Sequence, residues 1–249
     1  MNRPCIIVPV YNHPHSLDVL VEGLEPFDVP TLMINDGSDE LCTRCLRQID
    51  RANEWITLIE RPCNGGKGAA VKTGLRAAAL LGFTHALQVD ADGQHDLDDL
   101  PRLLQLSQSN PEAVICGYPT FENIPSVRLY GRYLTHVWVW INTLSLDIRD
   151  SMCGFRVYPL SHTLAEIDQS KTGDRMEFDP EILVRLHWRG LRVIEIPTRV
   201  SYPQDGISHF QSFRDNLLIS WAHTRLFFGM LRRLPELLRR RRYPLAREY

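Results

Sequence analysis

Two carboxylates and an amide stand at alternate positions in the segment Asp90-Ala91-Asp92-Gly93-Gln94-His95, directly after a predicted strand. Asp90, Asp92 and Gln94 can therefore face one point, and their hard oxygen atoms favour Mg²⁺ or Mn²⁺ over a softer metal ion. A calcium-binding loop starting at Asp90 is excluded, because it would need glycine in place of His95 and a carboxylate in place of Pro101. The alternative is that the aspartates only cap the helix that follows.

A second candidate is the glycine-rich segment Asn64-Gly65-Gly66-Lys67-Gly68, which precedes a helix rich in alanine and leucine. It is not a Walker A loop, because Gly68 stands where that motif requires Ser or Thr and Arg61 replaces its first glycine. Glycines before a helix let backbone amides approach an anion, and Lys67 adds positive charge. The plainer alternative is a tight turn with a surface lysine.

Two pairs of charged residues could serve phosphate or proton chemistry. Arg128 and Arg132 are four residues apart on a predicted helix, so both guanidinium groups lie on one face. Asp179, with Glu177 as second choice, lies before another predicted helix and could take a proton from a hydroxyl. The alternatives are a solvated helix face for the arginines and a favourable helix-dipole position for the acids.

The predicted elements place these residues at one edge of a sheet. Short apolar runs at 5–10, 31–34, 56–60 and 86–89 alternate with helical patterns, which predicts a parallel sheet with crossover helices. Ligands collect at the carboxyl ends of such strands, and three of these four ends carry acidic, glycine or amide residues. The later patterns predict helices over 97–107, 128–146 and 176–188, strands over 113–117 and within 150–158, and a last strand over 193–200 whose Pro197 suits a sheet edge.

The composition indicates a globular domain over residues 1–205 and an appended tail over 206–249. The 249 residues are 44 % hydrophobic and 23 % charged, which excludes collagen, coiled coil and low-complexity disorder. Six cysteines are scattered without a complete zinc pattern, and we expect them to be reduced. The net charge is −2, yet residues 214–249 hold nine arginines and three acids, so the preceding part is acidic.

The tail has an amphipathic pattern. Apolar residues recur every three or four positions among arginines, which predicts a helix lying flat on anionic lipid. Docking onto the preceding domain or a partner is the alternative, and nucleic acid is disfavoured because the body is acidic and has no recognition motif. No apolar run approaches the ~18 to 20 residues of a membrane-spanning helix, so we expect a cytoplasmic protein attached peripherally to the inner face of the cell membrane. The apolar positions are Leu217, Trp221, Phe228, Leu231, Leu234 and Leu238, and the arginines are Arg225, Arg232, Arg233 and Arg239 to Arg242.

Five motifs in their order and spacing resemble those of family 2 glycosyltransferases with the GT-A fold. The similarity covers about residues 5–208 and looks closest to the branch of dolichol-phosphate mannose synthase and related polyprenyl-phosphate glycosyltransferases. It implies an α/β fold, a Rossmann-like, mostly parallel sheet flanked by helices, here with a C-terminal amphipathic helical extension. The motifs are Ile6-Ile7-Val8-Pro9-Val10-Tyr11-Asn12, Asn35-Asp36-Gly37-Ser38, Asn64-Gly65-Gly66-Lys67-Gly68-Ala69, Asp90-Ala91-Asp92-Gly93-Gln94-His95 and Gly154-Phe155-Arg156.

The resemblance also implies roles for individual residues. Asp90, Asp92 and Gln94 would hold Mg²⁺ or Mn²⁺ against the diphosphate of a nucleotide sugar, which makes Asp92 essential for catalysis. The expected reaction is a single displacement with inversion, in which cations stabilise the charge that develops on the departing nucleoside diphosphate. Asp179 matches the catalytic base of many family members. The nucleotide would contact Pro9, Tyr11, Asn12, Asp36 and Lys67, and the phosphate groups of donor or acceptor would contact Arg128, Arg132 and Arg156.

One segment departs from the resemblance. Lipid-phosphate enzymes of this family usually end the core with Arg-x-x-Gly-x-Ser-Lys, whereas Pro203 and His209 replace both cations here. The departure favours a hydroxyl acceptor, with Asp179 or His209 taking the proton, and Ser208 and His209 are expected to line the substrate site. Residues 202–210 also look similar to glycosyltransferases of bacterial aryl polyene lipid pathways. Ordinary loop packing of His209 is the alternative.

These observations predict a metal-dependent, inverting glycosyltransferase that moves a sugar from a nucleotide-sugar donor to a lipid or lipid-phosphate acceptor at an anionic membrane surface. A sugar-phosphate nucleotidyltransferase is the first alternative, but it would want a long glycine- and arginine-rich loop where Tyr11-Asn12-His13-Pro14 stands. The second is a non-catalytic, nucleotide-sugar-binding subunit that recruits another protein to the membrane. Intact Asp90, Asp92 and Arg156 argue against it.

Overall fold

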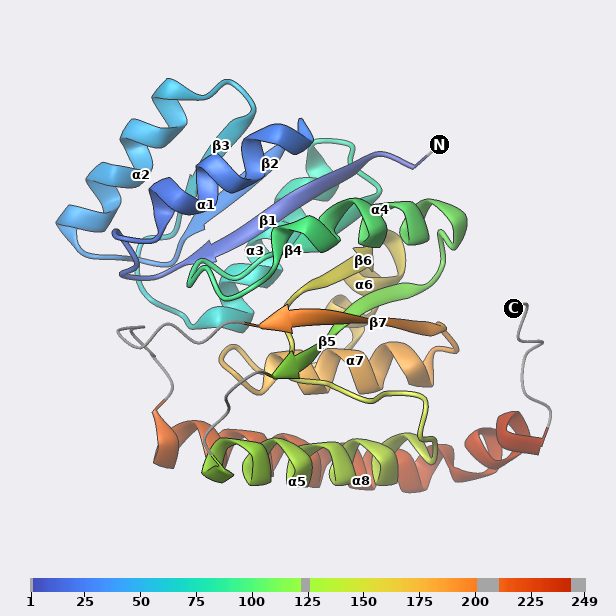
Figure 1. Ribbon diagram of the computed structural model, residues 1–249. Helices are drawn as coiled ribbons and strands as arrows, with labels where there is room; N and C mark the ends of the chain where they lie inside the picture. Colours follow the sequence, from blue (N-terminus) through green and yellow to red (C-terminus); the bar gives the residue numbers. More distant parts are fainter. Residues whose placement is uncertain (1, 122–125, 201–210, 243–249) are drawn as a thin grey trace.

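The computed structural model describes residues 2–121, 126–200 and 211–242, which form one seven-stranded sheet with helices on both faces (Figure 1). The strands are β1 (Pro4–Val10), β2 (Thr31–Asn35), β3 (Ile56–Glu60), β4 (His85–Gln88), β5 (Val114–Phe121), β6 (Arg156–Pro159) and β7 (Val193–Val200). The helices are α1 (Leu17–Leu24), α2 (Glu40–Ala52), α3 (Lys67–Leu80), α4 (Leu100–Ser109), α5 (Ser126–Thr143), α6 (Leu160–Gln169), α7 (Phe178–Trp188) and α8 (Ser212–Arg242), with short 3₁₀ helices η1 (Glu25–Phe27) and η2 (Leu97–Asp99). The predicted α/β fold is confirmed.

The sheet is mostly parallel, in the order β3-β2-β1-β4-β6-β5-β7. The first four strands pair in parallel, and β5 pairs in parallel with β7. β6 runs antiparallel to both of its neighbours, β4 and β5. β7 forms an edge of the sheet, as Pro197 predicted, because proline has no N–H to donate to a further strand.

Alternating side chains of the central strands divide the core into two layers, one on each face of the sheet. On β1, Ile6, Val8 and Val10 belong to the layer that contains α1, α2 and α4. Cys5 and Ile7 belong to the layer that contains α3, α6 and α7. Burial on both faces explains why these strands are continuous apolar runs and not alternating patterns.

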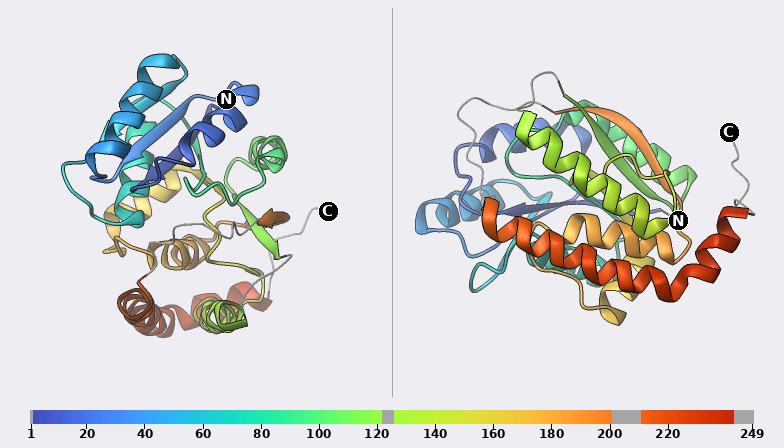
Figure 2. Two further views of the ribbon diagram at one scale, coloured as in Figure 1. Left: turned by 60° about the vertical axis from the view of Figure 1, so that its left-hand side comes forward. Right: turned by 90° about the horizontal axis from the view of Figure 1, so that it is seen from below.

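α8 packs on the body through its inner face and lies beside α5 at the lower face of the molecule (Figures 1 and 2). Gly229 of α8 contacts Trp188 at the end of α7, where an added Cβ would lie 2.7 Å from the indole ring. Arg240 donates to the carbonyl oxygen of Trp188 at 2.9 Å and so caps α7. The expected boundary at residue 205 lies outside the described residues. The buried side chains of α8 include Ile219, Ala222, Leu226, Met230 and Leu237.

Gly229→Leu should lower the free energy of unfolding by about 1–3 kcal/mol, because the new side chain would have to displace Trp188. Gly131→Leu is the matched control, since a Cβ at that position of α5 meets nothing within 4 Å. Urea unfolding of the two variants measures the difference. Equal stability of both would contradict the packing of α8 on α7.

Candidate active site

The carboxyl ends of β2, β1 and β4 are neighbours, and the polar residues that follow these strands meet there as predicted. Asn12, which follows β1, has a left-handed φ of 53° and is held by hydrogen bonds to the loop that follows β2. Its backbone N–H donates to Ser38 Oγ at 3.1 Å, and its side-chain oxygen accepts the N–H of Asp39 at 2.8 Å. Asn12 therefore joins two loops of the predicted nucleotide site, with Pro9 and Tyr11 half-buried beside it.

Lys67, the first residue of α3, lies between two carboxylates from distant parts of the chain. Its ammonium is 2.8 Å from Asp90 Oδ2 and 2.9 Å from Asp179 Oδ2. Burial opposes the charge on Lys67, but Asp179 and Asp90 outweigh it and raise the pKa of Lys67 above its ordinary value. Burial likewise opposes ionisation of Asp90, yet Lys67 and His95 hold the pKa of Asp90 well below its usual range. Lys67 and Asp90 are therefore both charged at neutral pH.

Asp92 lies next to this cluster, near the negative charge of Asp90. Its Oδ1 accepts the backbone N–H of Gln94 at 3.1 Å. Burial and then the charge of Asp90 raise the pKa of Asp92 above its ordinary value. These residues fit the predicted divalent cation, because a bound ion would offset the cost of burying Asp92 and its repulsion from Asp90. Carboxylate and amide oxygens are also the hard donors that such an ion prefers.

A complete metal cage is not preformed. In residues 2–121, 126–200 and 211–242, no group of three or more His, Cys, Asp or Glu side chains is arranged to hold a metal ion. Asp92 and Gln94 would therefore share the ion with oxygen atoms of a bound phosphate ligand, which is the usual arrangement for Mg²⁺. Asp90 binds Lys67 through Oδ2 and accepts a hydrogen bond from Gln88 through Oδ1 in this structure.

The glycine-rich turn before α3 does not offer its amides freely to an anion. Asp36, which is 2 % exposed, accepts the N–H of Gly65 at 3.0 Å and that of Gly66 at 2.8 Å, and it pairs with Arg61. The expected anion cradle thus already holds a carboxylate of the protein. The same contacts direct Asp36 toward the turn, whereas we had expected it to bind the base or ribose.

Arg156 is fully buried and donates to backbone carbonyl groups. Its guanidinium binds the carbonyl oxygens of Asp179 at 3.0 Å, Cys153 at 3.0 Å and Ser151 at 3.2 Å. The loop before β6 is thereby joined to the first turn of α7, which carries Asp179. In this arrangement Arg156 positions the cluster through the backbone and presents no donor to solvent. Gly154 of the same loop lies against Asp90, where an added Cβ would be 2.6 Å from Oδ2.

Arg132 of α5 pairs with Asp150, a buried residue of that loop. The contact is bidentate, with Arg132 Nη2 2.7 Å from Asp150 Oδ1 and Nε bonded to Oδ2. His136 Nε2 lies 3.1 Å from the same carboxylate. Burial opposes the charge on Asp150, but His136 and Arg132 hold its pKa well below the usual range. The Arg128 side chain and the residues Ser208 and His209 lie outside the described part of the structure.

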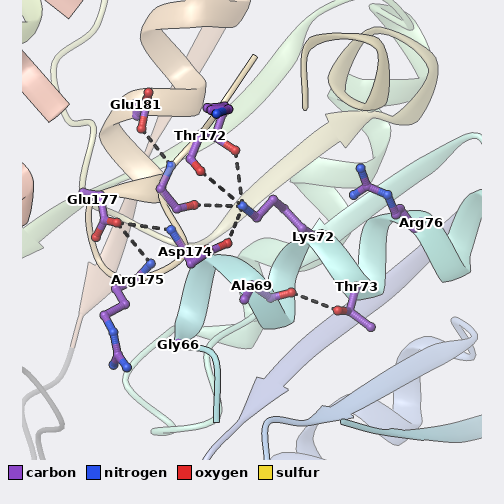
Figure 3. Close-up of polar contacts among 12 residues, drawn as sticks. Gly66, Ala69, Lys72, Thr73, Arg76, Thr172, Asp174, Arg175, Glu177 and Glu181 are labelled. Atoms are coloured by element: carbon purple, nitrogen blue, oxygen red, sulfur yellow. Dashed lines mark hydrogen bonds and ion pairs between the residues drawn. The ribbon is translucent and has the colours of Figure 1, made fainter. Parts of the chain in front are cut away.

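The segment 172–177 packs against α3 through polar contacts (Figure 3). Lys72 donates to the carbonyl oxygen of Gly173 at 3.0 Å and lies 2.6 Å from Asp174 Oδ1. The Asp174 carbonyl oxygen accepts the N–H of Ala69 at 2.8 Å. Glu177, the second candidate base, instead accepts the N–H of Asp174 at 3.1 Å. It therefore shapes the loop.

Glu181 connects this loop to α8. The carboxylate is fully buried and accepts the N–H of Gly173 at 2.9 Å. Arg185 lies 2.8 Å from one of its oxygens, and Arg225 of α8 lies 3.0 Å from the other. Sequence reasoning missed Lys72, Glu181 and this role of Arg225, because residues that bind a remote backbone segment leave no local motif.

Comparison with known proteins agrees with this geometry. The model of the family described as Glycosyl transferase family 2 matches residues 5–165. A dolichyl-phosphate beta-glucosyltransferase of Trichomonas vaginalis is 30 % identical over 212 residues, which are 76 % of this chain and 63 % of that protein. The chain thus spans less than two thirds of that relative.

Solved structures share the fold. The glucosyl-3-phosphoglycerate synthase of Mycobacterium tuberculosis matches with a TM-score of 0.67 at 11 % identity, over 92 % of this chain and 80 % of that one. A mannosyltransferase of Pyrobaculum calidifontis, solved with GDP-Man and Mn²⁺, matches with a TM-score of 0.59 at 15 % identity, over 93 % and 64 % of the two chains. At these identities the similarity is one of architecture.

Lys67→Met should destabilise the protein at neutral pH by about 2–4 kcal/mol, because it leaves the half-buried Asp90 and the buried Asp179 without their shared counter-charge. Since the wild-type pKa of Asp90 is lowered, the stabilisation from Lys67 is present above the ordinary carboxyl pKa of about 4 and is lost as the pH falls. The difference between variant and wild type should therefore shrink toward low pH.

Urea unfolding at about pH 7 and at about pH 2.5 tests this, because the stabilisation is lost only below the ordinary carboxyl pKa of about 4. Lys171→Met, at an exposed position, is the control for loss of one positive charge. A destabilisation that is the same at both pH values would show that Lys67 does not act through these carboxylates.

Proposed function

The chain belongs to glycosyl transferase family 2, and we propose that it transfers a sugar from a nucleotide-sugar donor to a lipid-phosphate acceptor, with inversion at the anomeric carbon and with a divalent cation. The observation that carries this proposal is the cluster of Asp90, Lys67 and Asp179, with Asp92 beside it. The relative from Trichomonas vaginalis is named for the acceptor dolichyl phosphate. That acceptor class supports the proposal for this chain.

The cluster is suited to a leaving group that gains negative charge. Asp92 and Gln94 would hold Mg²⁺ or Mn²⁺, which would neutralise charge on the donor diphosphate as its bond to the sugar breaks. Lys67 is half-buried and cationic, so it supplies a second positive charge in surroundings where water screens it only in part. The acceptor oxygen attacks the anomeric carbon from the opposite side, and a nucleoside diphosphate leaves.

The ion pair between Asp179 and Lys67 favours an acceptor that already carries a negative charge. Its Oδ2 is paired with Lys67, whereas its buried Oδ1 has no hydrogen-bond partner among the described residues. A phosphate acceptor needs no base, so Asp179 would chiefly hold Lys67 in place. With a hydroxyl acceptor, Oδ1 is the atom that would take the proton.

A small pocket beside the cluster suits the phosphate of the acceptor. Arg149 is exposed there, donates to the Tyr118 hydroxyl at 3.3 Å and lies 5.2 Å from the centre of the Tyr118 ring. Asp150 in the pocket wall is four residues from Gly154, which contacts Asp90, so the Cα atoms of Asp150 and Gly154 are at most about 14 Å apart. Arg149 could thus supply positive charge that residues 203–209 lack, where Pro203 and His209 replace the two cations of lipid-phosphate enzymes. The lining residues are Tyr118, Pro119, Arg132, Tyr133, His136, Arg149 and Asp150.

The lower face formed by α5 and α8 supports attachment to a membrane surface (Figure 2). Large apolar side chains on both helices are exposed, with Arg232 and Arg239 also exposed on α8. An apolar helix face with arginines binds anionic lipid by lying in the interface. Among the described helices, none has the length and apolar character to cross a bilayer. The exposed apolar residues are Tyr133, Leu134, Trp138 and Ile141 of α5, and Phe213, Leu217, Trp221, Phe228, Leu231 and Leu238 of α8.

Asp92→Asn should reduce metal-dependent sugar transfer to polyprenyl phosphate by about a hundredfold or more, because it removes charge from the proposed metal site while keeping the shape of the side chain. Transfer is measured with a panel of nucleotide sugars in Mg²⁺, in Mn²⁺ and with a chelator. Urea unfolding shows whether the fold is intact. Undiminished transfer by a folded Asp92→Asn variant would remove the metal assignment.

The double variant Trp221→Glu, Phe228→Glu should bind vesicles that contain phosphatidylglycerol about tenfold or more weakly than wild type, since it places charge on the exposed face of α8. Vesicle sedimentation measures binding. Leu80→Glu is the control, because Leu80 is 90 % exposed on α3, away from this face. If the double variant and the control bind alike, α8 is not the lipid-binding surface.

A further inference from the structure

We propose that Arg175 is a phosphate-binding residue of the active site, which contacts a phosphate group of the donor or of the acceptor from beside the glycine-rich turn. The proposal takes the chemical class of the ligand from the proposed function. The position of the site is argued from the contacts around Gly66 and from the fact that the neighbouring cations already have partners.

The backbone of Arg175 is fixed by its surroundings. Its N–H donates to Glu177 Oε1 at 3.4 Å, and its carbonyl oxygen accepts the N–H of Phe178 at 3.2 Å. The preceding residue, Asp174, is held by Lys72 and by the N–H of Ala69. Arg175 therefore starts from a rigid loop, which lowers the entropy lost when its side chain binds a ligand.

The side chain of Arg175 lies directly on the glycine-rich turn. Gly66 has a φ of 101°, and an added Cβ there would be 2.6 Å from Arg175 Cγ. Figure 3 shows the side chain pointing away from Lys72 and lying beside this turn. Lys67, the next residue after Gly66, contacts Asp179. The stem of the Arg175 side chain and the charged cluster thus lie against two consecutive residues, Gly66 and Lys67.

The other positive groups around the turn already have partners. The amides of Gly65 and Gly66 and the side chain of Arg61 bind Asp36. Lys67 binds Asp90 and Asp179, and Arg156 is buried on carbonyl groups. The half-buried Arg175 differs from them, because its guanidinium has no hydrogen bond or ion pair within the described part of the chain.

A partly buried guanidinium without a carboxylate is well suited to an anionic ligand. Its five N–H donors lie in one plane and match two oxygens of a phosphate group. Since the amides of the turn are occupied by Asp36, a phosphate group near α3 would find its free donors on Arg175. This residue therefore takes the part that the sequence had suggested for the glycine amides.

The test compares Arg175→Gln and Arg175→Lys with Arg102→Gln, a control that removes the same charge from an exposed position of α4. Isothermal titration with UDP, GDP, uridine and guanosine in Mg²⁺ measures whether Arg175 binds a donor phosphate. The KM for polyprenyl phosphate measures whether it binds the acceptor. Urea unfolding of each variant reports on the fold.

Loss of a charged hydrogen-bonded pair should weaken binding by about tenfold to a hundredfold. We expect Arg175→Gln to show this loss either in the affinity for the nucleoside diphosphate or in the acceptor KM, with Arg175→Lys intermediate. Binding of the nucleoside itself should not change. Nucleoside diphosphate affinity and acceptor KM both within about twofold of the Arg102→Gln control would overturn the proposal, as would an equal loss of nucleoside affinity.

The titration with nucleotides does not depend on the proposed reaction, so the two proposals can fail separately. A wild-type protein that transfers no sugar, but whose nucleoside diphosphate binding depends on Arg175, would refute the transferase proposal and support this site. A protein that transfers sugar equally well with and without the Arg175 guanidinium, at unchanged KM values, would refute this site alone.

Discussion

The candidate active site is organised around one half-buried ammonium group. Lys67 at the start of α3 joins Asp90, which follows β4, to Asp179 in the first turn of α7. Removing Lys67 would leave two carboxylates without their shared counter-charge, so the three segments must approach closely. The glycines around the cluster reflect this: an added Cβ at Gly68 would lie 2.5 Å from Phe178, and one at Gly154 would lie 2.6 Å from Asp90. The glycine-rich pattern is thus as much a packing requirement as a phosphate signal.

Local patterns predicted the strands and the residues at their carboxyl ends, because hydrophobic period and turn chemistry are written in consecutive positions. They could not predict pairings between separate βα units. Asp36 and the glycine-rich turn both looked like ligand sites, yet each satisfies the other through the amides of Gly65 and Gly66. The motif identified Arg156 but did not predict its burial, because its partners are backbone carbonyl groups, which every residue carries.

The last helix shows a second limit of sequence patterns. α8 has two apolar faces, one buried through Leu226 and Met230 and one exposed through Trp221 and Phe228. Periodicity predicted the helix and most of the exposed positions, but only contact with α5 and α7 decides which face turns inward. The arginines divide in the same way: Arg225 binds the buried Glu181, whereas Arg232 stays exposed. One stretch of positive charge thus serves both the fold and the surface.

The single carboxylate of Glu181 has a practical meaning for engineering. Because it receives Arg225 from α8 and the N–H of Gly173 from the loop that carries Arg175, the C-terminal helix is not an exchangeable cassette. A chimera that imported the corresponding helix from another family member would need to bring a guanidinium to the same place. Otherwise the graft would leave an unpaired acid in the interior, two residues from Asp179 of the candidate active site.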